Sequence, residues 1–502
     1  MEGPEQIRKC SRSLCVLFRS LKEAAAQNKS MVGRPEHAAI AREAAQKGVV
    51  LLENRNKLLP LKPSDYVGKT ILVTGPHSGN ETAFPHGFCF GDSPLQPNCQ
   101  GSGMPGDILG TDYSGTPGHI STPIAAVRAT FPGATILHVS GCTHPWCGSS
   151  GLPDAPDLPA VAAAAARASL VLFFGGVSGH VNHNTTQGKP NGVGPPGQMD
   201  YYHMGSCHDP TNTSCHPFEL GAATEGNDRW NISLPSGQEA LLVAASSNVR
   251  APVVASIVGG FPVTSVGASN ADAYVVAGVG GQEGGVGLLD VLTGNASPGG
   301  RLPYTLHAKQ SDLPDITVYG DLVNQTYRNR QFAEIDSPPR YRFGDGRSYA
   351  AFRYSHLVVS PASPSVCDAI TVSVDVANPE AFEADEVVQV YTRCPCGYAE
   401  CQAGACDHAA LQTPPLTALL GFRRVTVAAT STQTVRVTIS ARRRARFRPL
   451  GGADLGMLEE VRPGELWLTV GGGQLGSTTA SAVLEARVQV GGSATPTANC
   501  PA

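Results

Sequence analysis

Short apolar runs that end in glycine alternate with helical stretches between residues 134 and 292. The runs are ATILHVSG at 134–141, SLVLFFGG at 169–176, PVVASIVGG at 252–260 and ADAYVVAG at 271–278, and helical patterns occupy 157–168, 236–248 and 281–292. Near-continuous apolar runs are typical of parallel strands that are buried on both faces. Their alternation with helices predicts an α/β fold with a doubly wound, mostly parallel sheet, an α/β sandwich.

The same rhythm begins nearer the N-terminus. After Pro35, the stretch EHAAIAREAAQKG predicts an amphipathic helix that ends at Gly48, and KTILVTGP at 69–76 predicts a strand with its turn. Residues 6–27 also have apolar residues at helical spacing, but nothing nearby offers a packing partner. We therefore interpret residues 1–35 as the remnant helix of a preceding domain and residues 36–346 as the α/β domain.

The pattern changes to period two beyond Tyr349. Alternating apolar and polar residues occur at 369–378, 385–394, 433–440 and 464–472, which predicts the strands of an antiparallel sandwich. We assign residues 347–490 to this all-β domain and expect residues 491–502, GGSATPTANCPA, to form a loose tail.

One connection in the α/β region is unusually long. About sixty residues separate Gly176 from Pro235, whereas α/β loops usually take about 2–6. The loop carries ATEGNDR at 223–229, directly before the helical pattern at 236–248. Ligands of such sheets bind at the loops beyond the strand carboxyl ends, so this charged segment is a candidate site.

Charge and hydropathy exclude two classes of partner. The formal net charge of the 502 residues is −4 with a pI near 6.4, so no basic surface for nucleic acid is expected. No apolar run reaches the roughly 18–20 residues that span a bilayer, so we expect no membrane insertion. The N-terminus has no secretory pattern of charged and then apolar residues.

Cysteine usage nevertheless favours an oxidising, extracellular setting. Close pairs among the fourteen cysteines resemble local disulfide loops, namely Cys89/Cys99, Cys142/Cys147 and Cys207/Cys215. In CPCGYAECQAGACDH at 394–408 we favour disulfides over zinc, because the spacing fits no standard zinc finger. Seven glycosylation sequons point the same way, at Asn28, Asn80, Asn184, Asn212, Asn231, Asn295 and Asn324. We expect a secreted glycoprotein.

Two further motifs have a structural interpretation. AGVGGQEGG at 277–285 has Glu283 where a dinucleotide loop needs its third glycine, so we interpret it as a tight strand-to-helix turn. The histidine-rich stretches at 180–184 and 201–209 would suit a metal or a sugar subsite, but an exposed polar insert is the favoured interpretation.

A collinear set of motifs resembles glycoside hydrolase family 3, in particular its β-xylosidase and β-glucosidase branch. The motifs are HAAIAREAAQKGVVLLEN, TILVTGP, TDYSG at 111–115, ATEGNDRWNISLP, AGVGGQEGGVGLLDVLTGNASPGGRLPYT at 277–305, QTYRNRQF, YRFGDGRSYAAF and LLGFRRV. Members of that branch have a barrel domain, an α/β sandwich and a fibronectin type III-like domain. The resemblance implies that these 502 residues supply the second and third domains, and that a barrel domain is a possible missing partner.

The resemblance also implies a site. Retaining glycosidases use two carboxylates about 5–5.5 Å apart, a nucleophile and an acid/base. The family's nucleophile is an Asp of the barrel, and its acid/base corresponds to Glu225 here, with Asp228 and Arg229 as supporting residues and Glu219 as the spare candidate. Charge pattern alone would favour a surface ion pair with a solvated Glu225.

We therefore expect a glycoside hydrolase of the β-xylosidase or β-glucosidase type, most similar to β-xylosidases, that cleaves terminal β-linked sugars of cell-wall polysaccharides such as xylan. It needs neither a cofactor nor a metal for this chemistry. Its partner is an oligosaccharide or glycoside substrate. The alternative is an inactive fragment or a stand-alone carbohydrate-binding or interaction module. Tyr113 and Arg328 lie in family motifs and are assigned to packing before substrate contact.

Overall fold

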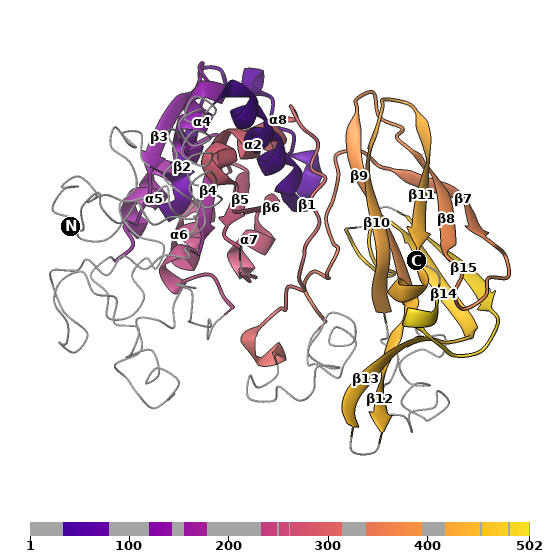
Figure 1. Ribbon diagram of the computed structural model, residues 1–502. Coiled ribbons are helices and arrows are strands. Elements are labelled where there is room, and N and C mark those ends of the chain that lie inside the picture. The colour runs from indigo at the N-terminus through magenta and orange to yellow at the C-terminus, as the bar shows by residue number, and fades with distance from the viewer. Residues whose placement is uncertain are drawn as a thin grey trace, which may run out of the picture.

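The computed structural model describes residues 34–79, 120–142, 155–177, 232–247, 250–260, 262–313, 338–393, 417–451, 454–479 and 482–500. They form an α/β unit and a β unit, which lie side by side in Figure 1. The helical pattern at 6–27 lies outside the described residues, and only residues 34 and 35 of the segment 1–35 are described.

The α/β unit is built on one six-stranded sheet with the order β1-β6-β5-β4-β2-β3. Its strands are β1 Val50–Asn54, β2 Thr70–Thr74, β3 Thr135–Val139, β4 Leu170–Gly176, β5 Val253–Val258 and β6 Ala273–Gly278. Strands β2 to β6 pair in parallel, and only β1 runs antiparallel, against β6. Phe173 belongs to the core on one face and Phe174 to the core on the other, as expected for a strand that is buried on both faces.

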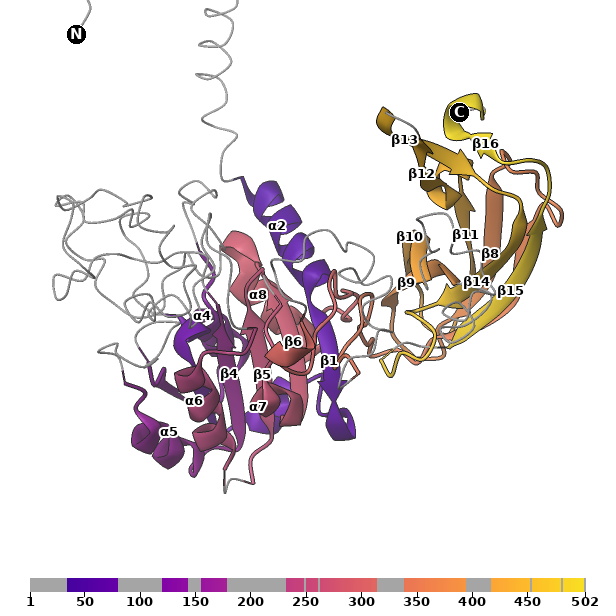
Figure 2. The ribbon, with the colours of Figure 1, turned by 90° about the horizontal axis from the view of Figure 1, so that it is seen from below.

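Helices cover both faces of this sheet (Figure 2). One face carries α2 Pro35–Gly48, α4 Pro123–Thr130 and α8 Gly284–Thr293, and the other carries α5 Leu158–Ala165, α6 Ser236–Ser246 and α7 Val266–Asn270. Side-chain caps fix several starts: Thr122, Asp157 and Ser265 each accept a backbone N–H three residues on. The predicted doubly wound, mostly parallel sheet is confirmed.

The β unit consists of antiparallel sheets with the orders β10-β9-β14-β15, β11-β8-β7 and β12-β13-β16. Its strands are β7 Arg353–Ser360, β8 Ile370–Ala377, β9 Ala384–Arg393, β10 Thr417–Val427, β11 Thr432–Ile439, β12 Arg446–Gly451, β13 Asp454–Val461, β14 Gly464–Gly471, β15 Val483–Val490 and β16 Thr495–Pro496. Every second residue of β8 is buried, from Ile370 to Val376, so one face packs on the core. The predicted all-β sandwich is confirmed.

Short 3₁₀ turns complete the described elements. They are η3 Arg55–Lys57, η4 Pro63–Tyr66, η5 Pro76–Ser78, η8 Gly281–Glu283, η9 Gln310–Asp312, η11 Ala441–Arg444 and η12 Thr497–Asn499.

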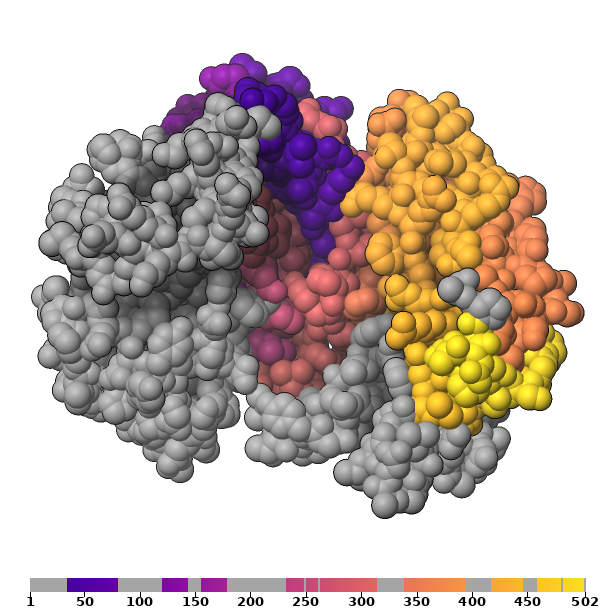
Figure 3. Space-filling model, viewed as in Figure 1, coloured from indigo at the N-terminus to yellow at the C-terminus, as the bar shows by residue number. Residues whose placement is uncertain are grey.

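The two units are joined by buried polar contacts, and they meet in the space-filling view of Figure 3. Arg301 of the α/β unit donates to both carboxylate oxygens of Glu386 on β9 at 3.1 Å, and the Tyr354 hydroxyl donates to the same carboxylate at 2.8 Å. Gln389 donates to the carbonyls of Gly344 and Gly472, at 3.0 and 2.9 Å. Burial raises the pKa of Glu386, and the Arg301 guanidinium and the Tyr354 hydroxyl act against that rise.

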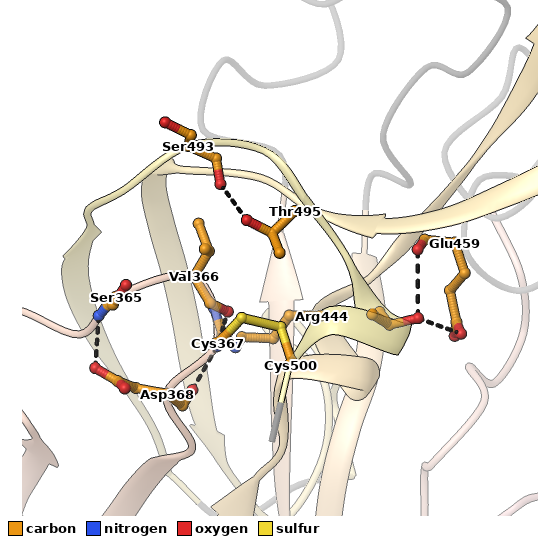
Figure 4. The surroundings of a disulfide bond; sticks show 10 residues. Ser365, Val366, Cys367, Asp368, Arg444, Glu459, Ser493, Thr495 and Cys500 are labelled. Carbon is orange, nitrogen blue, oxygen red and sulfur yellow. Dashed lines mark hydrogen bonds between the residues drawn. A yellow bond between two sulfur atoms is a disulfide. The ribbon is translucent and has the colours of Figure 1, made fainter. Parts of the chain in front are cut away.

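The C-terminal residues differ from the loose tail expected at 491–502. Within residues 491–500, β16 pairs with β13, Thr497 donates to Glu459 at 2.7 Å, and Cys500 forms a disulfide with Cys367. Arg444 reinforces this site by donating to carbonyls on both sides of Cys367 (Figure 4). Backbone pairing and a covalent bond hold this segment in place, so its lack of large side chains misled the sequence-based expectation.

Candidate functional site

The strand order places a topological switch point between β2 and β4. These strands are parallel neighbours, yet the chain continues from β2 to β3 on one side and from β4 to β5 on the other. Ligands of open α/β sheets bind outside the carboxyl ends of the strands at such a point. Two long connections leave from here, through 80–119 and 178–231, which lie outside the described residues. We call residues 75–79 and 175–177 the switch-point edge.

Both ends of the second connection are attached to described structure. At its start, the buried side chain of Gln238 on α6 accepts from the Gly176 N–H at 2.8 Å and donates to the Gly176 carbonyl at 2.7 Å. At its return, Ser233 and Thr264 form a parallel bridge, with Leu234 N–H donating to the Thr264 carbonyl at 2.7 Å. These contacts therefore fix where the connection leaves β4 and where it returns to α6.

The predicted site residues belong to this connection. Glu225, Asp228, Arg229 and Glu219 all lie outside the described residues, so their predicted roles stay predictions. Tyr113, Arg328, the histidine-rich stretches and the 394–408 cluster lie outside them too. Cys142 is disulfide-bonded, and its partner is not among the described cysteines. Of the seven sequons, only Asn295 lies in the described ranges.

His77 on η5, directly after β2, is a residue that the sequence analysis missed. Its side chain is 1% exposed, and within the described structure neither ring nitrogen has a hydrogen-bond partner. Burial lowers its pKa from 6.5 to about 3, so the ring is neutral at physiological pH. A buried polar group without a partner is uncommon and needs an explanation. The signal was available in Gly-Pro-His-Ser-Gly, a turn that directly follows the strand TILVT.

Small residues bring the neighbouring backbones close to His77. A Cβ on Gly75, which has φ +95°, would lie 2.3 Å from the Phe174 carbonyl oxygen, so only glycine fits. Next to it, the Ser78 hydroxyl donates to the Gly75 carbonyl at 2.7 Å and lies 3.0 Å from His138 Nε2. The switch-point edge is therefore closely packed, and it carries the polar side chains of His77 and Ser78.

The glycine-rich loop at 277–285 is the strand-to-helix turn that its sequence predicts. β6 ends at Gly278, η8 spans Gly281–Glu283, and α8 starts at Gly284. A Cβ on Gly285 would lie 2.4 Å from the Ser121 carbonyl oxygen, so this loop packs tightly on the start of α4. Among the described residues, no three His, Cys, Asp or Glu side chains gather as a metal site requires. None of the described helices combines the length and hydropathy of a membrane span.

Comparisons with known proteins agree with this architecture. The sequence profile of the glycosyl hydrolase family 3 C-terminal domain matches residues 49–349. Probable β-glucosidase J of Aspergillus fumigatus is 32% identical over 229 residues, which make up 43% of this chain and 25% of that protein. The periplasmic β-glucosidase of Salmonella typhimurium is 26% identical over 404 residues, which make up 78% of this chain and 43% of that protein.

A solved structure shares the fold. The crystal structure of the GH3 β-glucosidase of Bifidobacterium adolescentis superimposes with a TM-score of 0.62 and 22% identity, over 97% of this chain and 58% of that chain. The chain thus spans a quarter to less than half of the length of the two relatives above. The resemblance inferred from the motifs is confirmed, and because the profile covers more than half of the chain, this chain belongs to glycosyl hydrolase family 3, whose C-terminal domain it carries.

Proposed function

We propose that this chain supplies the acid/base carboxylate, Glu225, to a centre that hydrolyses terminal β-linked glycosyl bonds. The observation that carries the proposal is that the 178–231 connection starts at the switch-point edge, where Gln238 holds Gly176, and returns at residues 232–234, which pair with Thr264. Ile232 is seven positions after Glu225, so even a fully extended chain keeps their Cα atoms within about 25 Å. Within that limit, we place Glu225 at the edge at which α/β sheets bind their ligands.

The chemistry assigned to Glu225 follows the retaining route. The protonated carboxyl donates to the glycosidic oxygen as the bond to the leaving group breaks, and the carboxylate later removes a proton from the attacking water. The nucleophile is an Asp of a barrel domain in this family, and we place it outside these 502 residues. Asp228 and Arg229 are proposed to pair and to hold the segment that carries Glu225.

A barrel domain would dock against the switch-point edge. α2 packs along α8 and the turn η8, and η8 follows the carboxyl end of β6. Two apolar side chains are exposed there, Ile40 on α2 (64%) and Val279 after β6 (42%). A barrel domain placed at this end would cover both side chains.

The names of the relatives bear on sugar preference and on location. The two curated relatives are named β-glucosidases, which favours glucose as the first terminal sugar to test, and the β-xylosidase assignment stays a prediction. One of them is named as periplasmic. Together with the Cys367–Cys500 disulfide, this supports an oxidising, extracytoplasmic location.

The proposal is tested with aryl β-glucosides and aryl β-xylosides. We expect the 502-residue chain alone to give no turnover, and the chain fused behind a family 3 barrel domain to be active. In the active fusion, Glu225→Gln should abolish hydrolysis of alkyl glycosides and spare 2,4-dinitrophenyl glycosides far more, because a good leaving group needs no proton. The matched control is Glu219→Gln, which should keep full activity. Turnover by the chain alone, or an active fusion that is indifferent to Glu225→Gln, contradicts the proposal.

A further inference from the structure

A cleft of about 440 Å³ opens at the junction of the two units, away from the switch-point edge. It lies on the side of the sheet where β1 is the edge strand, with β6 and β5 between it and β4. The indigo residues of α2 and the orange residues of the β unit face each other across this junction in Figure 3. Its volume is within the range of small-molecule sites, about 300–1,000 Å³. No part of the proposed reaction uses it.

The two walls of the cleft come from different units and are tied together. On the β unit, Arg424 Nε donates to Asp385 at 2.7 Å, and Thr426 donates to the other oxygen of the same carboxylate at 2.7 Å. From there Arg424 Nη1 crosses the cleft and donates to the Lys47 carbonyl at the end of α2, at 2.9 Å. The cleft therefore has a fixed floor that joins the units.

The charged residues that line the cleft are two cations, Lys47 and Arg424, and two anions, Glu383 and Asp385. Their arrangement decides the class of ligand. The two cations are already engaged, Arg424 with Asp385 and the Lys47 ammonium with Glu43 on the exposed face of α2. The Glu383 carboxylate also lines the cleft and is exposed. Because a phosphate or sulfate would need a free cation, an anionic ligand is disfavoured. The surroundings suit a neutral molecule with many hydroxyl groups.

The remaining wall residues offer what such a molecule binds. Phe382 lines the cleft and the residue is 42% exposed, so an aromatic side chain is available at this wall. Among the other lining residues, Gln46 and Asn295 each use their amide nitrogen on Asp290, at 2.6 and 3.3 Å. Their amide oxygens remain available as acceptors for hydroxyl donors. An apolar ring face beside acceptors is complementary to a sugar ring, with its C–H face and its equatorial hydroxyls.

We propose that this cleft is an accessory binding site for a neutral, β-linked oligosaccharide, with Phe382 as the stacking surface and Glu383, Gln46 and Asn295 as hydrogen-bond acceptors. The proposal rests on the proposed function only for the class of ligand and not for any catalytic step. In this arrangement the cleft holds a distant part of the glycan while the switch-point edge serves the terminal sugar.

Binding of cellobiose and xylobiose to the purified chain tests the proposal, by titration calorimetry and ligand-observed NMR. Production in a bacterial host leaves the sequon at Asn295 unmodified. We expect dissociation constants on the order of 1 mM, and binding about tenfold weaker for Phe382→Ala, since one lost aromatic contact corresponds to roughly 1.4 kcal/mol. The control is Phe422→Ala: this ring on β10 is 64% exposed but does not line the cleft.

The measured dissociation constants and the folding of the variants decide whether Phe382 contacts the sugar. Unchanged folding of Phe382→Ala by circular dichroism, together with weaker binding for it alone, supports the proposal. Equal binding by Phe382→Ala and wild type, absence of any binding up to solubility, or tighter binding of a galacturonate dimer than of the neutral sugars overturns it. The test measures binding without turnover and depends on Phe382 alone, so failure of the proposed catalytic role leaves this result intact.

Discussion

Replacing His77 by leucine should remove much of the acid sensitivity of the α/β unit. The wild-type imidazole is buried after β2 and has no hydrogen-bond partner in the described structure, so folding keeps it neutral. Unfolding exposes it to water, where its pKa returns to about 6.5. Below that pH the unfolded chain binds a proton that the folded chain does not bind, and stability therefore falls as the pH falls.

The size of the effect follows from the two pKa values. The folded pKa is about 3, so the window of proton uptake on unfolding runs from about pH 6.5 down to about pH 3. Each pH unit inside this window changes the free energy of unfolding by about 1.4 kcal/mol. Between pH 7 and pH 4, His77 should therefore remove about 3 kcal/mol, out of the 5–15 kcal/mol typical of a folded domain. The same interval should cost His77→Leu about 3 kcal/mol less than wild type.

Urea unfolding at pH 7, 5 and 4 checks this, followed by circular dichroism at 222 nm because every described α-helix belongs to the α/β unit. The free energy of unfolding that wild type loses between pH 7 and pH 4, minus the free energy that His77→Leu loses, gives the contribution of His77. All other titrating groups are common to both proteins. His356→Asn is the comparison variant for an exposed histidine: the His356 side chain is 81% exposed on β7, where it lies 3.1 Å from Asp375, and it is not part of the α/β unit. Parallel curves for wild type and His77→Leu would refute the reasoning.

Three further substitutions test contacts that stabilise the two units. Arg301→Met leaves the fully buried Glu386 without its cation and should lower the stability to urea by about 3–5 kcal/mol at pH 7, with most of it regained when Glu386→Gln is added. Cys500→Ser opens a crosslink between residues 133 apart in sequence and should lower the unfolding free energy of the β unit by about 2–4 kcal/mol in non-reducing buffer. Gly285→Ala pushes a methyl group into the Ser121 carbonyl and should destabilise the α/β unit by about 1–3 kcal/mol in thermal unfolding.

The parallel strands were predictable because burial on both faces leaves little choice of residue. Phe173 and Phe174 point to opposite cores, so a strand that fits between two layers of helices must be apolar throughout. The antiparallel direction of β1 was not predictable in this way. It depends on the position at which α2 ends and β1 begins. The position of α2 is set by contacts with α8, which is distant in sequence, such as the 2.5 Å ion pair between Arg42 and Asp290.

The site was predictable to a different degree. Glu225 was inferred through a family motif, and its placement lies outside the described residues, so its role rests on the motif and on the anchored ends of its connection. His77 escaped the sequence analysis because its isolation is a tertiary property. A histidine in a turn normally meets water, and only the close approach of Gly75 to Phe174 shows how tightly this turn is packed against the sheet.

The junction explains why a cleft between two units can keep a defined shape. Its contacts mostly join a side chain of one segment to a backbone carbonyl of another: Gln389 to Gly344, Gln474 to Phe343 at 2.7 Å and Arg301 to Gly472 at 3.1 Å. Such bonds are specific in geometry but leave no pattern in the sequence, because any buried carbonyl can accept them. Since the walls of the cleft belong to different units, stiffness at the junction preorganises it, and a preorganised site loses less entropy when a ligand binds.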